Sequence, residues 1–379
     1  MPPFIAPELI AHILQHIPYH PYRHDLDHCA LISRSWTPYA RSITFQDICI
    51  SQPKHMFRFA DLLASPHETI SVAVKCMTIQ GGWFEFFATT RDLDTGLVIL
   101  EVFVTRSSLK FSVLEQLNLK NIAWENIPLS IQNAFIDTAN PFPSLVWIQQ
   151  LELVSCSFES YSQYWELIHA FPLLESLHHN EHVDISFESV PNVVVSGTTS
   201  RRPLQLHALR WHATDIPSKG TWQNAAMAFN TLLLECRESL EELELIVTQR
   251  YYHFGPLRLS ATQTLKDLFS MFDLTYTTRL QKLLIHNMAS IKQESYNFLP
   301  AFLENMTQTR SKTLQDLELR SCIPMKHHGY KEDIHESSSK EEEDEDGGSS
   351  KENEDLYGIP VNLVAMDTIL RDPFFNSLQ

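Results

Sequence analysis

The stretch LEELEL, from Leu240 to Leu245, has apolar side chains at its first, fourth and sixth positions, and this pattern decides the fold. Versions of it recur along the chain, and successive copies begin 26 to 40 residues apart. The copies are Val74–Ile79, Leu114–Leu119, Ile148–Leu153, Leu174–His179, Leu206–Trp211, Leu240–Leu245, Leu280–Ile285 and Leu314–Leu319. A recurrent period of this size indicates a solenoid, in which similar units stack on one another.

Each copy fits a short β-strand, because its last two apolar positions are two residues apart and point to the same face. Helical patterns lie between copies, at Tyr161–Phe171, Gln223–Arg237, Thr262–Phe272 and Tyr296–Thr307. Strands joined by helices lie parallel in one sheet. We therefore predict an α/β fold in which residues 49–330 form an irregular leucine-rich-repeat-like solenoid with a curved parallel sheet. The alternative is an ordinary α/β domain in which the L-x-x-L segments are helical.

Three short helical patterns precede this region, within residues 1–48. They cover Pro7–Pro18, Asp25–Trp36 and Thr37–Phe45, and a proline or a capping residue suits the start of each one. A unit of this size is rarely stable without outside help. The periodicity leaves two interpretations open, a helical cap on the following domain or a module that binds a partner protein.

Three segments in this region, IAPELIAHIL from Ile5, CALISRSW from Cys29 and YAR from Tyr39, together resemble an F-box. F-boxes usually begin Leu-Pro-x-Glu, and here Ile5 and Ala6 occupy the first two of those positions. The resemblance implies that the helices bind the adaptor subunit of an SCF-type (cullin–RING) ubiquitin ligase, and through it the cullin. The contact residues that it implies are Pro7, Glu8, Leu9, Ile10, Ile13, Leu31, Ser33 and Trp36.

An F-box followed by irregular repeats of the leucine-rich type resembles the arrangement of fungal F-box families. That resemblance implies a substrate-recognition subunit of the ligase, not an enzyme, with no catalytic residues and no cofactor of its own. The chain would hold an unknown target protein on the concave face of its sheet. Two alternatives remain, an interaction scaffold whose first helices only cap the solenoid, and an enzyme without a recognisable motif.

On a parallel-strand solenoid, the residue between the last two apolar positions of each copy points out from the sheet face. These residues are Thr78, Asn118, Glu152, His178, Arg210, Glu244, Leu284 and Glu318. The charged members Glu152, Arg210, Glu244 and Glu318 are the candidate target-binding residues. Their balance favours a partner with a basic or mixed surface, bound in a salt-sensitive way.

The composition argues against several other classes of protein. The net charge is −17, which disfavours binding to nucleic acid or to an anionic membrane surface. The six cysteines are scattered without a C-x-x-C pair, which suggests a reducing compartment, and we expect a cytoplasmic or nuclear protein. The segment His178–His182 could suggest a metal, but no further ligand motif accompanies it, so we expect a solvated polar turn and no metal site.

A strongly acidic run separates the repeats from the end of the sequence. Between Lys331 and Asp355, twelve acidic and three basic residues give a net charge of −9, so the remaining residues contribute −8. Within this run, Glu336–Asp355 contains no large apolar residue, and we predict that residues 331–355 form a disordered loop. Apolar residues return in 356–379, which we predict to be a C-terminal cap segment.

Overall fold

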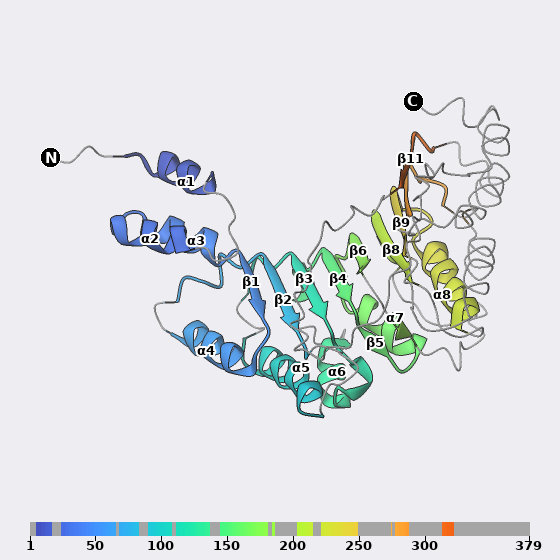
Figure 1. Ribbon diagram of the computed structural model, residues 1–379, viewed down its shortest axis with the longest axis horizontal. Helices are drawn as coiled ribbons and strands as arrows, with labels where there is room; N and C mark the ends of the chain where they lie inside the picture. Colours follow the sequence, from blue (N-terminus) through green and yellow to red (C-terminus); the bar gives the residue numbers. More distant parts are fainter. Residues whose placement is uncertain are drawn as a thin grey trace, which may run out of the picture.

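The chain is described here by a computed structural model, in which one curved sheet dominates (Figure 1). The described residues are 5–16, 24–65, 68–82, 90–107, 111–136, 145–180, 184–185, 203–214, 221–248, 274, 277–287 and 313–321. The acidic run, the expected C-terminal cap and the expected helices Thr262–Phe272 and Tyr296–Thr307 lie outside these residues.

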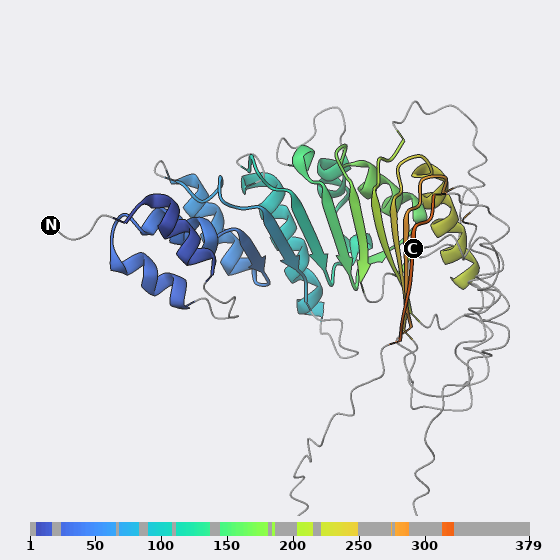
Figure 2. The same ribbon diagram turned by 90° about the horizontal axis from the view of Figure 1, so that it is seen from above.

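Three helices come first, α1 (Pro7–Gln15), α2 (His24–Ile32) and α3 (Thr37–Thr44). Pro7 occupies the start of α1, where its missing N–H is not needed, and Glu8 lies in the first turn as expected. Helix α2 starts at His24, one residue before the expected cap Asp25. Helix α3 starts at Thr37 itself, so Thr37 is not the N-cap that we predicted. Both ribbon views place the three helices beside the β1 end of the sheet (Figure 1, Figure 2).

Nine parallel strands form the main sheet, in the order β1-β2-β3-β4-β6-β8-β9-β10-β11. Their bounds are β1 (Asp47–Ile50), β2 (Cys76–Gln80), β3 (Gln116–Lys120), β4 (Gln150–Val154), β6 (Ser176–Asn180), β8 (Ala208–Thr214), β9 (Glu242–Thr248), β10 (Lys282–Asn287) and β11 (Asp316–Ser321). Neighbouring strands in the sheet are consecutive along the chain, apart from β5 (Ser157–Phe158) and β7 (Asp184–Ile185), which pair with each other.

All eight copies of the repeated pattern end on a strand of this one sheet, so the L-x-x-L segments are not helical. The prediction of a parallel sheet is confirmed. Strand β1 was not predicted, because Phe45 was assigned to the end of the third helix. In fact Phe45, Ile48 and Ile50 follow the same apolar spacing, and they form a ninth copy.

Helices lie along one face of the sheet (Figure 1). They are α4 (Pro53–Ala64), α5 (Thr90–Val102), continued by a π-helical turn at Phe103–Ser107, α6 (Leu129–Ile136), α7 (Tyr161–His169) and α8 (Thr221–Glu235). Short 3-10 turns occur at Trp124–Asn126 and Leu145–Trp147. Helix α7 begins where the Ser160 side chain accepts a hydrogen bond from the Gln163 amide. The expected helices Tyr161–Phe171 and Gln223–Arg237 are confirmed as α7 and α8.

The core lies between these helices and the sheet. The first apolar residue of each of the eight predicted copies is buried, from Val74 to Leu314, and so are inward-facing strand residues such as Leu117 and Leu243. Burying each such side chain contributes about 1.5–3 kcal/mol. The repeated apolar positions are therefore the main source of stability in the sheet.

A ladder of backbone hydrogen bonds joins the starts of the strands. In each copy, the carbonyl of the residue before the strand accepts two amides from the next copy. Glu115 accepts from Gln149 and Gln150, and Glu241 accepts in the same way from Gln281 and Lys282. The acceptors are Gln46, Lys75, Glu115, Gln149, Glu175, His207, Glu241 and Gln281. The contact between neighbouring copies is therefore the same from β1 to β11.

The residues that follow strands β3 and β4 turn the chain sharply. Asn121 and Ser155 adopt positive φ angles of 53° and 49° at equivalent positions. Gly81 occupies the corresponding position after β2, and a Cβ atom there would lie 2.2 Å from the Asn121 carbonyl oxygen. Gly81 therefore permits a close approach of two backbone segments.

Candidate functional site

Helices α1, α2 and α3 enclose a small core of their own. Ile10 and Leu14 of α1 meet Leu26 of α2 and Ala40 of α3, and the half-buried Trp36 packs against them. The buried residues of the sheet and its helices form a second, separate cluster. Among the described residues, the three helices therefore do not share their buried core with the sheet.

Large apolar side chains remain on the outside of this three-helix unit. Leu9 on α1 is 56% exposed, and Leu31 and Ile32 at the end of α2 are 82% and 65% exposed. Ile5 and Ile13 are exposed as well. Apolar side chains gathered on the surface of a small unit are typical of a site that binds another protein.

The predicted adaptor contacts fall into two groups. Glu8, Leu9, Ile13, Leu31 and Ser33 are exposed, and Pro7 and Trp36 are half-buried. We predicted Ile10 as an adaptor contact. It is only 2% exposed and lies inside the core of the three helices, so its role is to stabilise that core. Ile5 and Ile32 were not predicted as contacts, although each is an apolar residue close to a predicted contact.

The second candidate surface is the sheet face opposite the helices. The predicted row of residues is in register from strand to strand, through Thr78, Asn118, Glu152, His178, Arg210, Glu244, Leu284 and Glu318. The residues before and after each member point to the helix side, because strand side chains alternate. We call the face that carries this row the open face. Asn118 and Leu284 are nevertheless buried within the row.

Charged side chains on the open face are largely paired with one another. Glu244 accepts a hydrogen bond from Arg210 Nε at 2.6 Å, and its other oxygen lies 3.3 Å from His286 Nε2. Glu152 accepts a hydrogen bond from the Asn180 side chain. Of the four candidate target-binding residues, Glu152, Arg210 and Glu244 thus already have partners within the face, and Glu318 is half-buried.

We expected a solvated turn at His178–His182, which is wrong for residues 178–180 because they lie in strand β6. His178 lies on the open face, where burial and the nearby Arg210 guanidinium lower its pKa. His179 points inward and shares a 2.9 Å hydrogen bond with the Tyr164 hydroxyl. Burial lowers the pKa of His179 to about 3, so the ring is neutral in the folded protein. His182 lies outside the described residues.

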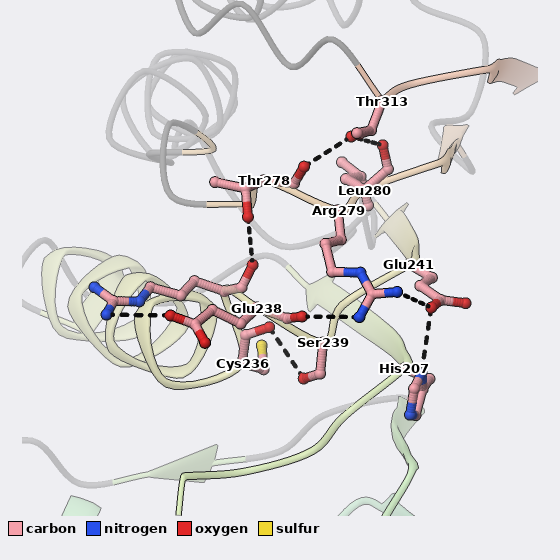
Figure 3. A network of polar contacts seen from close by, with 10 residues as sticks. His207, Cys236, Glu238, Ser239, Glu241, Thr278, Arg279, Leu280 and Thr313 are labelled. Carbon is pink, nitrogen blue, oxygen red and sulfur yellow. Dashed lines mark hydrogen bonds and ion pairs between the residues drawn. The ribbon is translucent and has the colours of Figure 1, made fainter.

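Polar contacts also connect neighbouring copies where strands β9 to β11 begin (Figure 3). The Glu241 carboxylate lies 3.6 Å from His207 Nδ1 and 3.6 Å from Arg279 Nη2. The Arg279 guanidinium also donates to the Glu238 carbonyl at 3.4 Å. Thr313 donates to the carbonyl oxygens of Thr278 and Leu280, which belong to the preceding copy. We interpret these contacts as holding the copies together, since they are made within the chain.

Three of the five described cysteines are poorly suited to nucleophilic chemistry. Burial raises the pKa of both Cys156 and Cys236 to about 12 and that of Cys76 to about 11. These side chains are therefore thiols at neutral pH, whereas a nucleophile requires the thiolate. Cys29, Cys49, Cys76, Cys156 and Cys236 are all free.

The described part of the chain contains no group of three or more His, Cys, Asp or Glu side chains placed to hold a metal ion. Within the same residues, no helix combines the length and apolar character required to cross a membrane. The sequence matches no protein-family model, and no curated protein is similar enough to count as a relative.

Proposed function

We propose that this chain is a substrate-recognition subunit of an SCF-type ubiquitin ligase. Helices α1 to α3 act as the F-box that binds the adaptor, and the sheet with its helices acts as a leucine-rich-repeat-like solenoid that binds the target. The observation that carries the proposal is the exposure of Leu9, Leu31 and Ile32 on a unit that has a complete core of its own.

The separation of the two cores favours a partner-binding module over a cap. A helix that caps a solenoid packs its apolar face on the last repeat and shares that repeat's core. Here Ile10, Leu14, Leu26 and Ala40 pack together instead. Leu9, Leu31 and Ile32 are exposed on this unit, where an adaptor could cover them.

Two features of the sheet support the solenoid part of the proposal. The strands follow one another in chain order, and each carbonyl of the backbone ladder receives two amides from the next copy. Nearest-neighbour contacts of one kind are typical of repeat proteins. The open face then offers the target a broad surface of mixed charge.

The proposed role requires no catalysis by this chain. In such a ligase the transfer of ubiquitin is carried out by partner proteins, and the recognition subunit contributes by holding the target near the conjugating enzyme. The partners are the adaptor, through it the cullin, and a target protein that remains to be identified. The proposed role implies a protein of the cytoplasm or the nucleus.

Capture of a purified adaptor subunit by the full chain tests the proposal. We expect Leu9→Asp and Leu31→Asp each to abolish capture, because a buried apolar anchor at the centre of an interface is replaced by a charge. Leu129→Asp is the matched control, since Leu129 on α6 is 69% exposed and lies on the sheet domain. Circular dichroism checks that each variant is folded. Failure of the unmodified chain to bind the adaptor, or capture by both charged variants, contradicts the proposal.

A further inference from the structure

Two histidines stand side by side on the exposed surface of the first helix. His12 lies within α1 and His16 is the residue that follows its last turn, four residues later. Their Nε2 atoms are 3.2 Å apart, and the ring centroids are separated by 4.4 Å. Both side chains are exposed.

This pair points away from the small core of the helical unit. The buried residues Ile10 and Leu14 each precede one of the histidines by two positions. At about 100° per residue, two positions correspond to about 200° around the helix axis. The imidazoles therefore lie on the side of α1 opposite its buried face, where an ion and its water ligands have room.

The distance between the two nitrogens matches that between two imidazole nitrogens bound to the same metal ion. Imidazole nitrogens bind Zn²⁺ at about 2.0–2.1 Å. Two such bonds at the tetrahedral angle place the nitrogens about 3.3 Å apart, and at a right angle about 2.9 Å apart. The 3.2 Å between His12 and His16 falls between these values. We propose that His12 and His16 form a two-ligand site for a divalent transition-metal ion.

The chemistry of the pair is consistent with this site. Without an ion, the two Nε2 atoms are hydrogen-bonded to each other, and the tautomers decide which ring donates. When the ion binds, the donor ring changes tautomer and carries its proton on Nδ1. Both Nε2 lone pairs are then available to the metal, and no proton is released overall. Imidazole ligands suit Zn²⁺, Ni²⁺ and Cu²⁺, and Cu²⁺ binds most tightly among them.

The site is an open one, because no third side chain completes it among the described residues. Water would fill the remaining coordination positions. Leu9 and Ile13 lie within about 100° of the two histidines around the helix, so a bound ion would sit on the face that we assign to the adaptor. The metal site does not rest on that assignment, and the experiment below measures the ion alone.

The site is tested by titrating the full chain with Cu²⁺ and monitoring binding by calorimetry and by electron paramagnetic resonance. We expect His12→Gln and His16→Gln each to weaken the tightest Cu²⁺ site about 100-fold, because one of the two linked ligands is lost. The resonance spectrum should lose its coupling to one imidazole nitrogen in each variant. Glutamine is a good helix former, so α1 is expected to remain intact.

His55→Gln is the matched control, because His55 is an exposed histidine on the separate helix α4. It should bind Cu²⁺ as the unmodified chain does. The chain contains 18 histidines, and the control separates this pair from the others. If both α1 variants keep the affinity and the nitrogen coupling of the unmodified chain, the proposal is wrong.

Discussion

His179 makes the stability of the sheet depend on pH, and its replacement by leucine tests this. The side chain is 1% exposed and occupies the inward position that Leu153 holds on the neighbouring strand. It touches the Trp211 ring, with 4.4 Å between ring centroids, and shares a hydrogen bond with Tyr164. Burial in this apolar environment disfavours a protonated imidazole.

The direction of the effect follows from the two states. Burial depresses the pKa of His179 to about 3 in the folded protein, whereas an unfolded histidine has a pKa of about 6.5. Above about pH 6.5 the ring is neutral in both states and pH has no effect through this group. Between about pH 6.5 and 3 only the unfolded state binds the proton, so stability is lost as the pH falls.

The expected magnitude is modest but measurable. Between about pH 7.5 and 5.5, His179 should lower the free energy of unfolding by about 1 kcal/mol. His179→Leu removes this dependence. At neutral pH the substitution itself has two opposing effects on the free energy of unfolding. The added apolar burial stabilises the fold, whereas Tyr164 loses its hydrogen-bond partner, which costs about 1–3 kcal/mol.

Urea unfolding, followed by tryptophan fluorescence at both pH values, measures the difference. The unmodified chain should lose about 1 kcal/mol more than His179→Leu on acidification. His178 is present in both proteins, so the difference between them reports His179 together with its electrostatic coupling to His178. His55→Leu, on the exposed side of α4, should behave as the unmodified chain does. Equal losses in the unmodified chain and in His179→Leu would refute the reasoning.

Three other substitutions test the packing and the open face. Gly81→Ala should lower the free energy of unfolding by about 2 kcal/mol or more, because the alanine Cβ would lie 2.2 Å from the Asn121 carbonyl oxygen. Unchanged stability in urea would contradict that geometry. Ser155→Gly should raise the free energy of unfolding by about 0.5–1 kcal/mol, since glycine adopts the positive φ of 49° without strain. A lower midpoint of thermal unfolding in this variant would contradict the prediction. A double-mutant cycle with Arg210→Ala and Glu244→Gln should give a coupling of about 0.5–1 kcal/mol that decreases in salt, and a coupling of zero would mean that the contact contributes nothing.

The sheet could be predicted from the sequence because each strand is marked by a local spacing of apolar residues. Two apolar residues separated by one, as at Leu117 and Leu119, must face the same side of a strand, and the spacing places every copy in the same register. Phe45 obeys the same rule, yet a preceding proline-led helix obscured it. The sequence shows the periodicity, but it does not show that a helix ends at Thr44 and that a strand begins three residues later, at Asp47.

The polar residues were harder to predict, because their partners are distant in sequence. His179 breaks the apolar pattern, and only the position of α7 shows that Tyr164 supplies its hydrogen bond. Glu244 was expected to be available for a target, whereas Arg210 and His286 come from the copies on either side to meet it. Ile10 and Leu9 are adjacent on one helix, and the packing of α2 and α3 decides which of them is buried.

The ladder at the strand starts has a consequence for how such a chain can evolve. Its bonds join a carbonyl to two amides, so no side chain takes part. The acceptor positions accordingly hold lysine, glutamate, glutamine and histidine without any change in the ladder. Substitutions can accumulate there over generations while the strands keep their alignment. Two descendants of one ancestor could thus share this architecture long after their sequences have diverged beyond recognition.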